Sequence, residues 1–395
     1  MSKYTYAVFI GRFQPYHKSH HEISKLGLEQ ADNLLFVLGS AFQARDVKNP
    51  FKAQEREAMI RACFSKEDQG RLHFLLMEDL HNLKHWTAEL GVRVLDYTGT
   101  KNFCLVGYKK DHSTSGYLRD LGWTLVSPKK RFPQDATDIR HAFFKEGVDG
   151  QIAKKLGDGS VKYFSIRNEI PAAIFDWLKD FQLTSEFEHL KGEFSYSQAY
   201  IEVNQDPAGF LLEQLKKEIS DKGLERDPVA QEVLDMAWGL YRRIPKYPVQ
   251  FITADAVIFQ GSRVLLGRRK YPPGKGLLAL PGGFVKDSEF LLNGAIREAK
   301  EETSIVQAVS RAFRADLRDF LQGSRVFDEP DRSLRGRTVT HAFCFKLPET
   351  KEPLQVKAGD DLEDLLWLPV SEVRAHKELF FEDHLMIIES FMNQG

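Results

Sequence analysis

The chain has 395 residues, and 55 Lys and Arg balance 56 Asp and Glu to give a formal net charge of −1. This length exceeds one ordinary core and predicts two domains, while 42% hydrophobic and 28% charged residues are typical of a soluble globular protein. The even charge argues against a nucleic-acid binder, which usually has a basic excess. No apolar run is long enough to span a bilayer, and the first residues lack the apolar region of a secretion signal. We therefore expect a cytoplasmic protein with neither a nucleic-acid nor a membrane partner.

Three cysteines, Cys63, Cys104 and Cys344, lie far apart in apolar segments. No C-x-x-C pair occurs, so the sequence indicates neither a thiolate zinc site nor a disulfide framework. Buried, reduced thiols are the expected state of cysteines in a cytoplasmic protein.

Short apolar runs recur through the first 130 residues, separated by helical patterns such as 52–64, in which Met59, Ile60 and Cys63 share a face. Continuous apolar strands alternating with helices predict a parallel sheet covered on both sides, a Rossmann-like fold. Ligands of such folds bind beyond the carboxyl ends of the strands. The runs are residues 6–11, 33–39, 72–77, 102–107 and 123–128.

The rest of the chain shows two other patterns of apolar and polar residues. Amphipathic helical segments with charged turns fill residues 186–246, which we interpret as a helical connector. Beyond it, alternating segments predict half-exposed strands of a mixed sheet, with helices at about 289–303 and 382–393. The predicted organisation is α/β throughout: a nucleotide-binding domain at 1–185, the connector, and an α/β/α domain at 247–395.

The stretch GRFQPYHKSH follows the first predicted strand. Helical spacing begins at Lys18, which places His17 at a helix entrance and His20 in its first turn. Helix N-termini expose unpaired N–H groups and the positive end of the helix dipole. Imidazoles and Arg12 at that point would form a phosphate pocket, which can stabilise a phosphoryl transition state without a protein nucleophile.

This stretch resembles the H-x-G-H signature of class I nucleotidyltransferases, and GRFQPxH is typical of the nicotinamide mononucleotide (NMN) adenylyltransferases. Segments 40–56, 80–86, 106–118 and 135–144 agree with that family, so the resemblance covers nearly all of residues 5–185. It implies transfer of an adenylyl group from ATP to NMN, giving NAD and pyrophosphate, with Mg²⁺ or Mn²⁺ as cofactor.

The same resemblance implies roles for individual residues. His17 and His20 would bind the ATP phosphates and stabilise the departing pyrophosphate. Asn49 would lie near NMN and Trp86 would stack on the nicotinamide ring, although an ordinary core position is the competing interpretation of Trp86. Ser19 stands where the family has a glycine, a residue that permits close backbone approach to the nucleotide. The ATP and phosphate contacts implied are Gly11, Arg12, Phe13, His17, His20, Thr137 and Arg140.

A second motif, PGGFVKDSEFLLNGAIREAKEETSI, occupies residues 281–305 and resembles the Nudix pattern G-x5-E-x7-R-E-U-x-E-E-x-G-U. Six specified Gly or charged residues match by chance with a probability of about 10⁻⁷ per starting point. Ser304 takes the place of the last glycine of the pattern, near the helix end where a positive φ is favoured. The matching residues are Gly283, Glu289, Arg297, Glu298, Glu301, Glu302 and Ile305.

The spacing of the glutamates indicates a metal site independently of the family resemblance. Glu298, Glu301 and Glu302 stand at i, i+3 and i+4, so they crowd one face of a helix. Mg²⁺ or Mn²⁺ would neutralise them, bridge a diphosphate and activate water for attack on phosphorus. Arg297 directly precedes Glu298 and therefore lies beside the helix face that the glutamates share. It is better placed to orient a glutamate than to bind metal. A solvated acidic helix face is the competing interpretation.

Three roles come only from the Nudix resemblance. It implies that Gly283 belongs to the metal site with the three glutamates, that Arg297 and Glu298 are catalytic, and that Glu289 supports the helix. The catalytic base varies among Nudix enzymes and stays unassigned.

The arginine-rich segment 325–343 resembles one found in ADP-ribose pyrophosphatases fused to NMN adenylyltransferases. It implies cleavage of ADP-ribose to AMP and ribose 5-phosphate, with Arg332 and Arg337 as candidate contacts to the diphosphate or terminal ribose. A solvated basic loop is the alternative for these two residues.

The sequence thus predicts a bifunctional enzyme of NAD metabolism whose partners are ATP, NMN, NAD and ADP-ribose. Two alternatives stay open. The transferase could act on another acceptor, such as phosphopantetheine or flavin mononucleotide, or use CTP, and the Nudix half could be a non-catalytic ADP-ribose sensor. A homo-oligomer is compatible with the sequence, which does not determine the oligomeric state.

Overall fold

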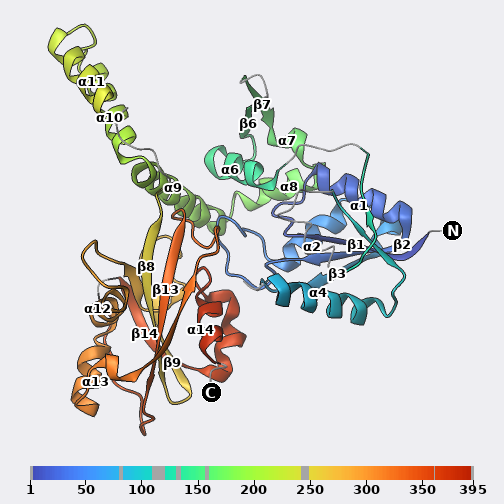
Figure 1. Cartoon of the computed structure of the whole chain (residues 1–395). Helices are drawn as coiled ribbons and strands as arrows, with labels where there is room; N and C mark the ends of the chain where they lie inside the picture. The colour runs from blue at the N-terminus through green and yellow to red at the C-terminus, as the bar shows by residue number, and fades with distance from the viewer. Residues whose placement is uncertain are drawn as a thin grey trace. The chain divides into compact units, whose positions relative to one another are not determined.

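The computed structural model describes residues 3–79, 83–108, 121–129, 135–155, 160–241, 249–359 and 361–392. The chain forms two compact units; Figure 1 shows the whole chain as a cartoon. The first consists of residues 1–194 and 372–390, and the second of residues 195–371 and 391–395. The chain therefore leaves the first unit within the predicted connector and returns to it near its C-terminus.

The sheet of the first unit is parallel, as predicted. In the described residues it has five strands in the order β3-β2-β1-β4-β5, and every neighbouring pair runs parallel. The inner strands are apolar on both faces, since Ala7, Val8, Leu34 and Leu35 have no exposed surface. The strands are β1 (Tyr4–Gly11), β2 (Ala31–Leu38), β3 (Leu72–Leu76), β4 (Phe103–Val106) and β5 (Leu125–Val126).

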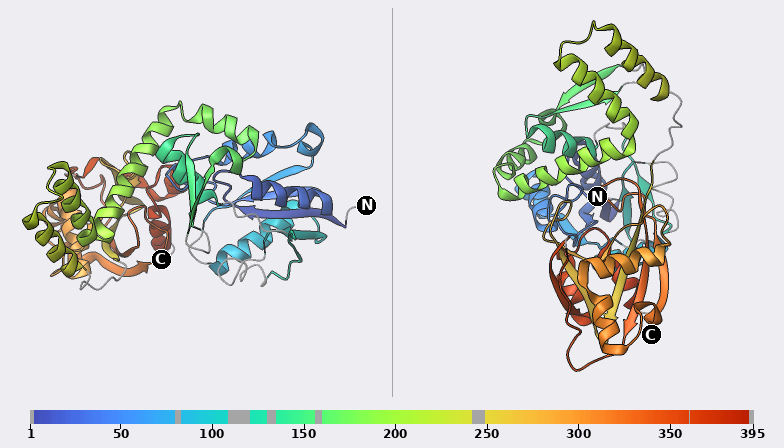
Figure 2. Two further views of the ribbon diagram at one scale, coloured as in Figure 1. Left: turned by 90° about the horizontal axis from the view of Figure 1, so that it is seen from above. Right: turned by 90° about the vertical axis from the view of Figure 1, so that its left-hand side faces the viewer.

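Helices cover both faces of this sheet (Figure 2). Gly27 of α1 lies against Ala7 and Leu34, on one face. Leu90 of α4 packs in one cluster with Val8, on the opposite face. The alternation of side chains along a strand explains why neighbours in sequence contact different helices.

The helices and a hairpin complete the first unit. The hairpin is absent from the sequence-based expectation because three lysines interrupt the apolar residues of its two short strands. The elements are α1 (Lys18–Gln30), α2 (Ala53–Ala62), α3 (Lys66–Gln69), α4 (Leu83–Thr98), α6 (Ala136–Glu146), β6 (Gln151–Lys155), β7 (Val161–Ser165), α7 (Ile166–Glu169) and α8 (Ala172–Phe181).

Helices also fill the described part of the predicted connector, whose residues 242–246 lie outside the description. These helices are α9 (Ser185–Gln205), α10 (Pro207–Asp221) and α11 (Pro228–Tyr241). Asp206 caps α10 by accepting a hydrogen bond from the Gly209 N–H, and Pro207 occupies its first position. Proline is favoured there because that N–H has no partner within the helix.

The second unit holds a mixed sheet, which confirms the predicted fold class. Its path in the described residues is β10-β9-β8-β13-β12, with β11 paired to β8 and β14 paired to β9. β8 and β13 run parallel, and the other pairs are antiparallel. The strands are β8 (Phe251–Gln260), β9 (Arg263–Arg269), β10 (Leu278–Ala279), β11 (Gly282–Phe284), β12 (Leu321–Phe327), β13 (Thr338–Leu347) and β14 (Leu362–Pro369).

The expectation of half-exposed strands is wrong for β8, which is buried from Thr253 to Gln260. Ala254 and Ala256 lie beneath α12 in the core of the unit, and their small side chains allow the helix to approach. Val257 and Phe259, on the other face, are buried as well. Central strands of this kind are apolar on both faces.

The helical elements after residue 290 include the two predicted ones. A third, α13, starts immediately after Ser304, whose φ of 51° allows the chain to turn between two helices. These elements are α12 (Leu291–Thr303), α13 (Ile305–Phe313), the 3₁₀ segments η1 (Leu317–Phe320) and η2 (Val370–Leu379), and α14 (His384–Met392).

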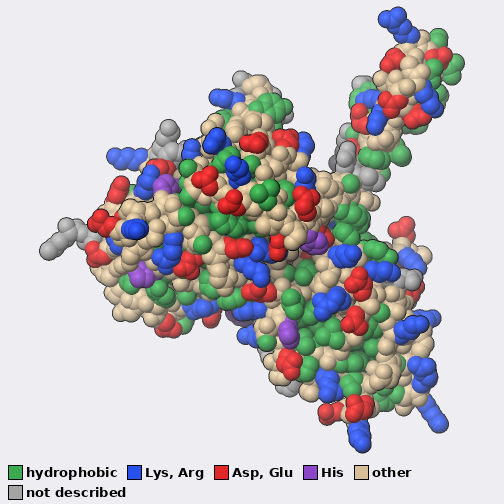
Figure 3. Space-filling model, turned by 180° about the vertical axis from the view of Figure 1, so that it is seen from behind, with side chains coloured by type: hydrophobic (Ala, Val, Ile, Leu, Met, Phe, Trp, Pro, Cys, Tyr) green, Lys and Arg blue, Asp and Glu red, His purple; other side chains and the backbone are tan. Residues whose placement is uncertain are grey.

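Basic and acidic side chains are interspersed on the face shown in Figure 3, in keeping with the near-zero net charge. Among the described residues, none of the helices combines the length and the apolar character needed to cross a bilayer. The three cysteines are free thiols, with Cys104 and Cys344 buried and Cys63 half-buried.

Candidate active sites

The first site begins where β1 ends at Gly11. A side chain at this position would approach the Phe13 ring, because a Cβ there would lie 2.9 Å from Phe13 Cζ. Phe13 is 1% exposed and has a φ of 52°, in the left-handed region. The Gly39 N–H donates to the Gly11 carbonyl at 3.0 Å, which joins this loop to the end of β2. The loop between β1 and α1 is thus compact and internally packed.

His17 and His20 lie at the entrance of α1, as predicted. His17 is the N-cap residue, and the two imidazole rings stack with centroids 3.6 Å apart. The His17 backbone N–H donates to His20 Nδ1 at 3.4 Å. The His20 ring also contacts Phe13 and Tyr16, at centroid distances of 4.9 and 5.7 Å. These contacts fix both imidazoles beside the N–H groups of the helix.

Arg140, on α6, belongs to the same site. Its side chain is buried and donates to the Gln14 carbonyl at 2.5 Å and to Thr137 Oγ1 at 3.2 Å. Burial, followed by the positive charge of Arg12, lowers the pKa of Arg140 to about 10. Two guanidinium groups that repel each other make a place where a phosphate would be stabilised.

Asp135 was missed in the sequence. Burial acts to raise its pKa, but hydrogen bonds from Thr137 and the charges of His17 and Arg140 lower the pKa overall. The carboxylate therefore lies within electrostatic reach of both residues. It caps α6 by accepting from the Thr137 N–H at 2.7 Å.

Arg56, on α2, was also missed. It is 1% exposed and donates to three backbone carbonyls, those of Arg12 at 2.6 Å, Gly39 at 2.8 Å and Ser40 at 3.2 Å. It therefore ties the loop after β1 to the loop after β2. The sequence held a signal for it, because position 56 shares the apolar helix face of Met59 and Ile60.

The two predicted NMN residues lie in the first unit as well. Asn49 is buried and donates from Nδ2 to Gln43 Oε1 at 3.0 Å. Trp86 is half-buried, packs against the Val8 cluster and donates from Nε1 to the Glu78 carbonyl at 3.1 Å. Trp86 thus has the core packing that was its competing interpretation, and its stacking role stays a prediction.

Ser19, which replaces the family glycine, is buried and donates to the Tyr108 hydroxyl at 3.3 Å. This bond connects α1 to the segment that follows β4. Residues 80–82 and 109–118, which belong to two of the resembling segments, lie outside the described residues.

The second site is built around Arg297 of α12. Its guanidinium donates to both Glu289 oxygens at 2.9 and 3.0 Å and to the Phe284 carbonyl at 3.0 Å. It also donates to Glu298 at 2.6 Å and to Glu301 at 3.0 Å. Arg297 therefore orients glutamates, as its offset from their helix face suggests.

Glu302 and Glu298 lie against the two glycines of β11. Glu302 accepts from the Gly282 N–H at 3.0 Å, and a Cβ on Gly283 would lie 2.8 Å from Glu298 Oε1. Burial, then the charges of Glu298 and Asp361, raise the pKa of Glu302 to about 8. Burial also raises the pKa of Glu298, with contributions from Glu301 and Asp361. Asp361, 59 positions after Glu302, was missed in the sequence.

The donor set suits a divalent cation by its chemistry. Glu302 is buried, and the charges of Glu298 and Asp361 help to raise its pKa. Hard cations prefer carboxylate oxygens of this kind. In this arrangement Glu298 and Glu301 both face Arg297, and within the described residues no three His, Cys, Asp or Glu side chains are grouped as a metal-binding cluster.

The predicted arginines of segment 325–343 contact their own loop. Arg337 donates to the Asp328 carbonyl, and the buried Arg332 donates its N–H to the Glu329 carbonyl at 3.1 Å. A different arginine, Arg335, lies over the Phe284 ring at 5.1 Å. Phe284 follows Gly283 directly, so Arg335 contacts the Nudix motif, although the sequence had indicated Arg332 and Arg337 as the candidates from this segment.

A parallel sheet with a cationic helix entrance, together with a mixed sheet that carries a glutamate-lined helix, defines a two-part nucleotide-processing protein. The NUDIX domain model matches residues 250–389, and the cytidylyltransferase-like model matches residues 8–95. The chain belongs to the family of NMN adenylyltransferases joined to a Nudix ADP-ribose pyrophosphatase domain.

Two relatives match separate halves of the chain. The nicotinamide/nicotinic acid mononucleotide adenylyltransferase of Acinetobacter baylyi is 34% identical over 197 residues, which cover 49% of this chain and 95% of that protein. The ADP-ribose pyrophosphatase of Methanocaldococcus jannaschii is 32% identical over 141 residues, or 36% of this chain and 72% of that protein.

A solved structure matches the whole chain. The bifunctional NMN adenylyltransferase/ADP ribose pyrophosphatase of Francisella tularensis is 25% identical, with a TM-score of 0.75 over 99% of both chains. A second crystal structure of that enzyme, complexed with AMP and a Mn ion, matches equally.

Proposed function

We propose that this chain is a bifunctional enzyme of NAD metabolism. The first unit joins NMN and ATP into NAD and pyrophosphate, and the Nudix domain hydrolyses ADP-ribose to AMP and ribose 5-phosphate. The observation that carries the proposal is the pairing of opposite sites in one chain. One surrounds a helix entrance with His17, His20, Arg12 and Arg140. The other brings together the half-buried Glu298 and the buried Glu302, whose pKa values are raised.

In the adenylyl transfer, an oxygen of the NMN phosphate attacks the α-phosphorus of ATP. The new P–O bond forms as the bond to the pyrophosphate breaks, so negative charge moves onto the departing group. His17, His20 and the N-terminal N–H groups of α1 stabilise that charge. No protein nucleophile is needed, because positioning and electrostatics suffice for phosphoryl chemistry.

Other residues hold the substrates in this scheme. Arg140 and Thr137, already joined by a hydrogen bond, bind the triphosphate. Gly11, Arg12 and Phe13 form the loop beneath it. Asn49 and Trp86 hold the acceptor, and their neighbours Gln43 and Glu78 keep both side chains in place.

In the hydrolysis, water attacks one phosphorus of the ADP-ribose diphosphate, and the bridging P–O bond breaks. Glu298, Glu301, Glu302 and the Gly283 backbone would hold Mg²⁺ or Mn²⁺, which when bound neutralises the diphosphate and activates water. Arg297 positions Glu298 and is itself held by Glu289. Arg332 and Arg337 are the proposed contacts to the sugar-phosphate end.

Separate incubations of the purified chain test the two halves. With NMN, ATP and Mg²⁺, chromatography should detect NAD, and with ADP-ribose and Mg²⁺ it should detect AMP and ribose 5-phosphate. Absence of NAD would refute the first half. The substitution Glu302→Gln tests the second, since hydrolysis at the wild-type rate in this variant would refute it while NAD synthesis serves as the internal control. The family relationship does not favour the sensor alternative, which predicts ADP-ribose binding without turnover.

A further inference from the structure

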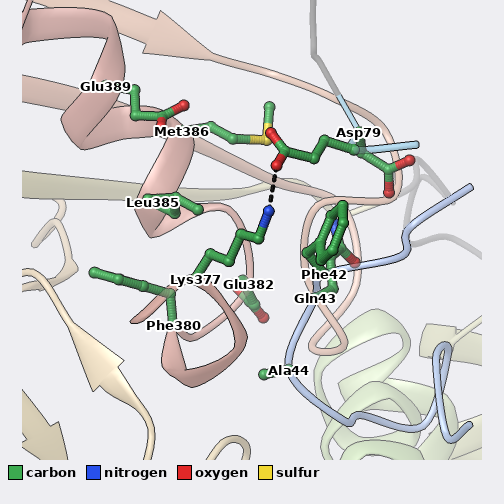
Figure 4. A pocket seen from close by; sticks show the side chains of 11 residues that line it. Phe42, Gln43, Ala44, Asp79, Lys377, Phe380, Glu382, Leu385, Met386 and Glu389 are labelled. Carbon is green, nitrogen blue, oxygen red and sulfur yellow. Dashed lines mark hydrogen bonds and ion pairs between the residues drawn. The ribbon is translucent and has the colours of Figure 1, made fainter. Parts of the chain in front are cut away.

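Segment 372–390, near the end of the chain, lies in the first unit against the loops that follow β2 and β3. Its Lys377 reaches across a pocket of about 500 Å³, part of which is open to solvent (Figure 4). Lys377 Nζ lies 3.2 Å from the centroid of the Phe42 ring and forms an ion pair with the Glu78 carboxylate. Glu78 and Lys377, which are 299 positions apart in sequence, are therefore in direct contact.

Glu78 is also the residue that holds Trp86. The indole Nε1 of Trp86 donates to the Glu78 carbonyl at 3.1 Å. The indole ring packs in the cluster around Val8, and Trp86 is not among the residues that line the pocket. Lys377 thus contacts the carboxylate of a residue whose backbone fixes the indole, and it reaches the proposed acceptor residue through Glu78.

The neighbouring residue, Asp79, has an anchor of its own on the phosphate side. It accepts hydrogen bonds from the Ser40 N–H and hydroxyl, at 3.2 and 2.5 Å. The Ser40 carbonyl accepts from the buried Arg56 at 3.2 Å, and Arg56 also donates to the Arg12 carbonyl at 2.6 Å. The loop proposed to bind ATP is therefore held by contacts that do not include Lys377.

The acceptor side depends more on Lys377, because Glu78 lies beyond β3, which ends at Leu76. The side chain of Glu78 is 40% exposed and that of Lys377 is 25% exposed, and an ion pair this exposed contributes little to folding stability. Lys377 is nevertheless kept in place, since a cation is stabilised over an aromatic face. The contact can therefore restrict the position of Glu78 without being needed for the fold.

We propose that Lys377 is a positioning residue for adenylyl transfer, which holds Glu78 and, through it, the indole of Trp86 where the acceptor nucleotide binds. The inference rests on the proposed transferase function and extends it to the far end of the chain. Lys377 lies within the stretch matched by the NUDIX domain model, residues 250–389. A side chain from the hydrolase part of the sequence therefore serves the reaction of the other site.

Steady-state kinetics of NAD synthesis by the full-length protein measure this role. Lys377→Met keeps an unbranched side chain over Phe42 but removes the charge that pairs with Glu78. The KM for NMN should rise by about threefold to tenfold, the range expected for loss of one hydrogen-bonded contact. The KM for ATP should stay within about twofold of the wild type, because groups that share no partners act independently. A merely structural defect would instead lower the apparent kcat and the rate of ADP-ribose hydrolysis, since fewer molecules would be folded.

Two further variants test the route through Glu78. Lys377→Arg should restore the KM for NMN to within about twofold of the wild type, because arginine can also lie over an aromatic ring and pair with a carboxylate. Glu78→Gln should raise this KM as Lys377→Met does. The double variant should raise it no further, since both changes break the same contact.

Glu378→Gln is the matched control. Glu378 is adjacent to Lys377 in the same segment but pairs with Lys52 at 3.6 Å, and neither residue of this pair lines the pocket. Its KM for NMN should equal that of the wild type. An unchanged KM in Lys377→Met would overturn the inference, as would an equal rise in Glu378→Gln or additive effects of Lys377→Met and Glu78→Gln. A wild-type protein that forms no NAD would instead refute the proposed function, and the role of Lys377 with it.

Discussion

In the proposed function, the two sites bind the same chemical group, a phosphate chain, with side chains of opposite charge. At the first, burial lowers the pKa of Arg56 and Arg140 to about 10, against the opposing effect of nearby carboxylates such as Asp79 and Asp135. At the second, burial and the charges of Glu298 and Asp361 raise the pKa of Glu302 to about 8, while Arg297 pairs with Glu298 and Glu301. In the proposed function, the first site takes phosphates directly, and the second takes them through a metal ion.

The largest expected effect is the loss of one activity while the other is kept. His17→Ala should lower kcat/KM for NAD synthesis by about 10²–10³-fold, the usual cost of losing one group that stabilises transition-state charge. Hydrolysis of ADP-ribose by the same preparation should keep its wild-type rate. Steady-state assays of both reactions provide the check, and a parallel loss of the two activities would contradict the assignment of separate sites.

The next effect concerns the charge of Glu302. Its folded-state pKa is raised, so the folded protein binds more protons than the unfolded chain between about pH 4.5 and 8. Stability without metal should therefore fall as pH rises through this range, by on the order of 5 kcal/mol. Denaturant unfolding in EDTA at several pH values measures this slope. Glu302→Gln should flatten it, and Mg²⁺ should stabilise the wild type most at high pH.

A smaller effect concerns the hydrogen bonds that the Arg297 guanidinium makes to several glutamates at once. Arg297→Lys keeps the positive charge but cannot hold both Glu289 oxygens together with Glu298 and Glu301, because lysine lacks the planar guanidinium. Hydrolysis of ADP-ribose should fall by roughly 10–100-fold, as for other groups that orient metal ligands. NAD synthesis is the control activity. Unchanged hydrolysis would mean that charge alone suffices.

The smallest effect concerns the end of α12. Ser304 has a φ of 51°, which costs an L-residue energy that glycine avoids. Ser304→Gly should stabilise the second unit by about 1 kcal/mol and leave both activities intact. Thermal unfolding provides the measurement. A lower melting temperature would show that the hydrogen bond from the Lys357 N–H to Ser304 Oγ, at 3.0 Å, outweighs the relief of strain.

The features that the sequence predicted correctly are those formed by residues close together along the chain. The strand ending at Gly11, the entrance of α1 at His17 and the glutamate face of α12 each follow from fewer than 20 consecutive residues, where periodicity and helix-end chemistry decide the structure. The parallel and mixed sheets were predicted for the same reason, since apolar runs alternate with helical patterns.

What the sequence did not reveal depends on contacts between distant segments. Asp361 reaches the Nudix glutamates, and Lys377 reaches Glu78, only after the chain has folded. Arg335, rather than Arg332 or Arg337, lies over Phe284 because of the path of its loop. No local periodicity records such proximity. The burial of β8 escaped prediction because small alanines let a helix cover a face that looked alternating.

The return of residues 372–390 to the first unit has a practical consequence for dissecting the chain. A fragment truncated at Phe194 would lack Lys377 and Glu382, and with them one wall of the cavity beside Phe42. Fragments of this kind, expressed to study NAD synthesis alone, would retain the phosphate loop but lack the segment whose Lys377 contacts Phe42 and Glu78. Internal deletion of the intervening Nudix strands, with the tail kept, would be the better-matched design.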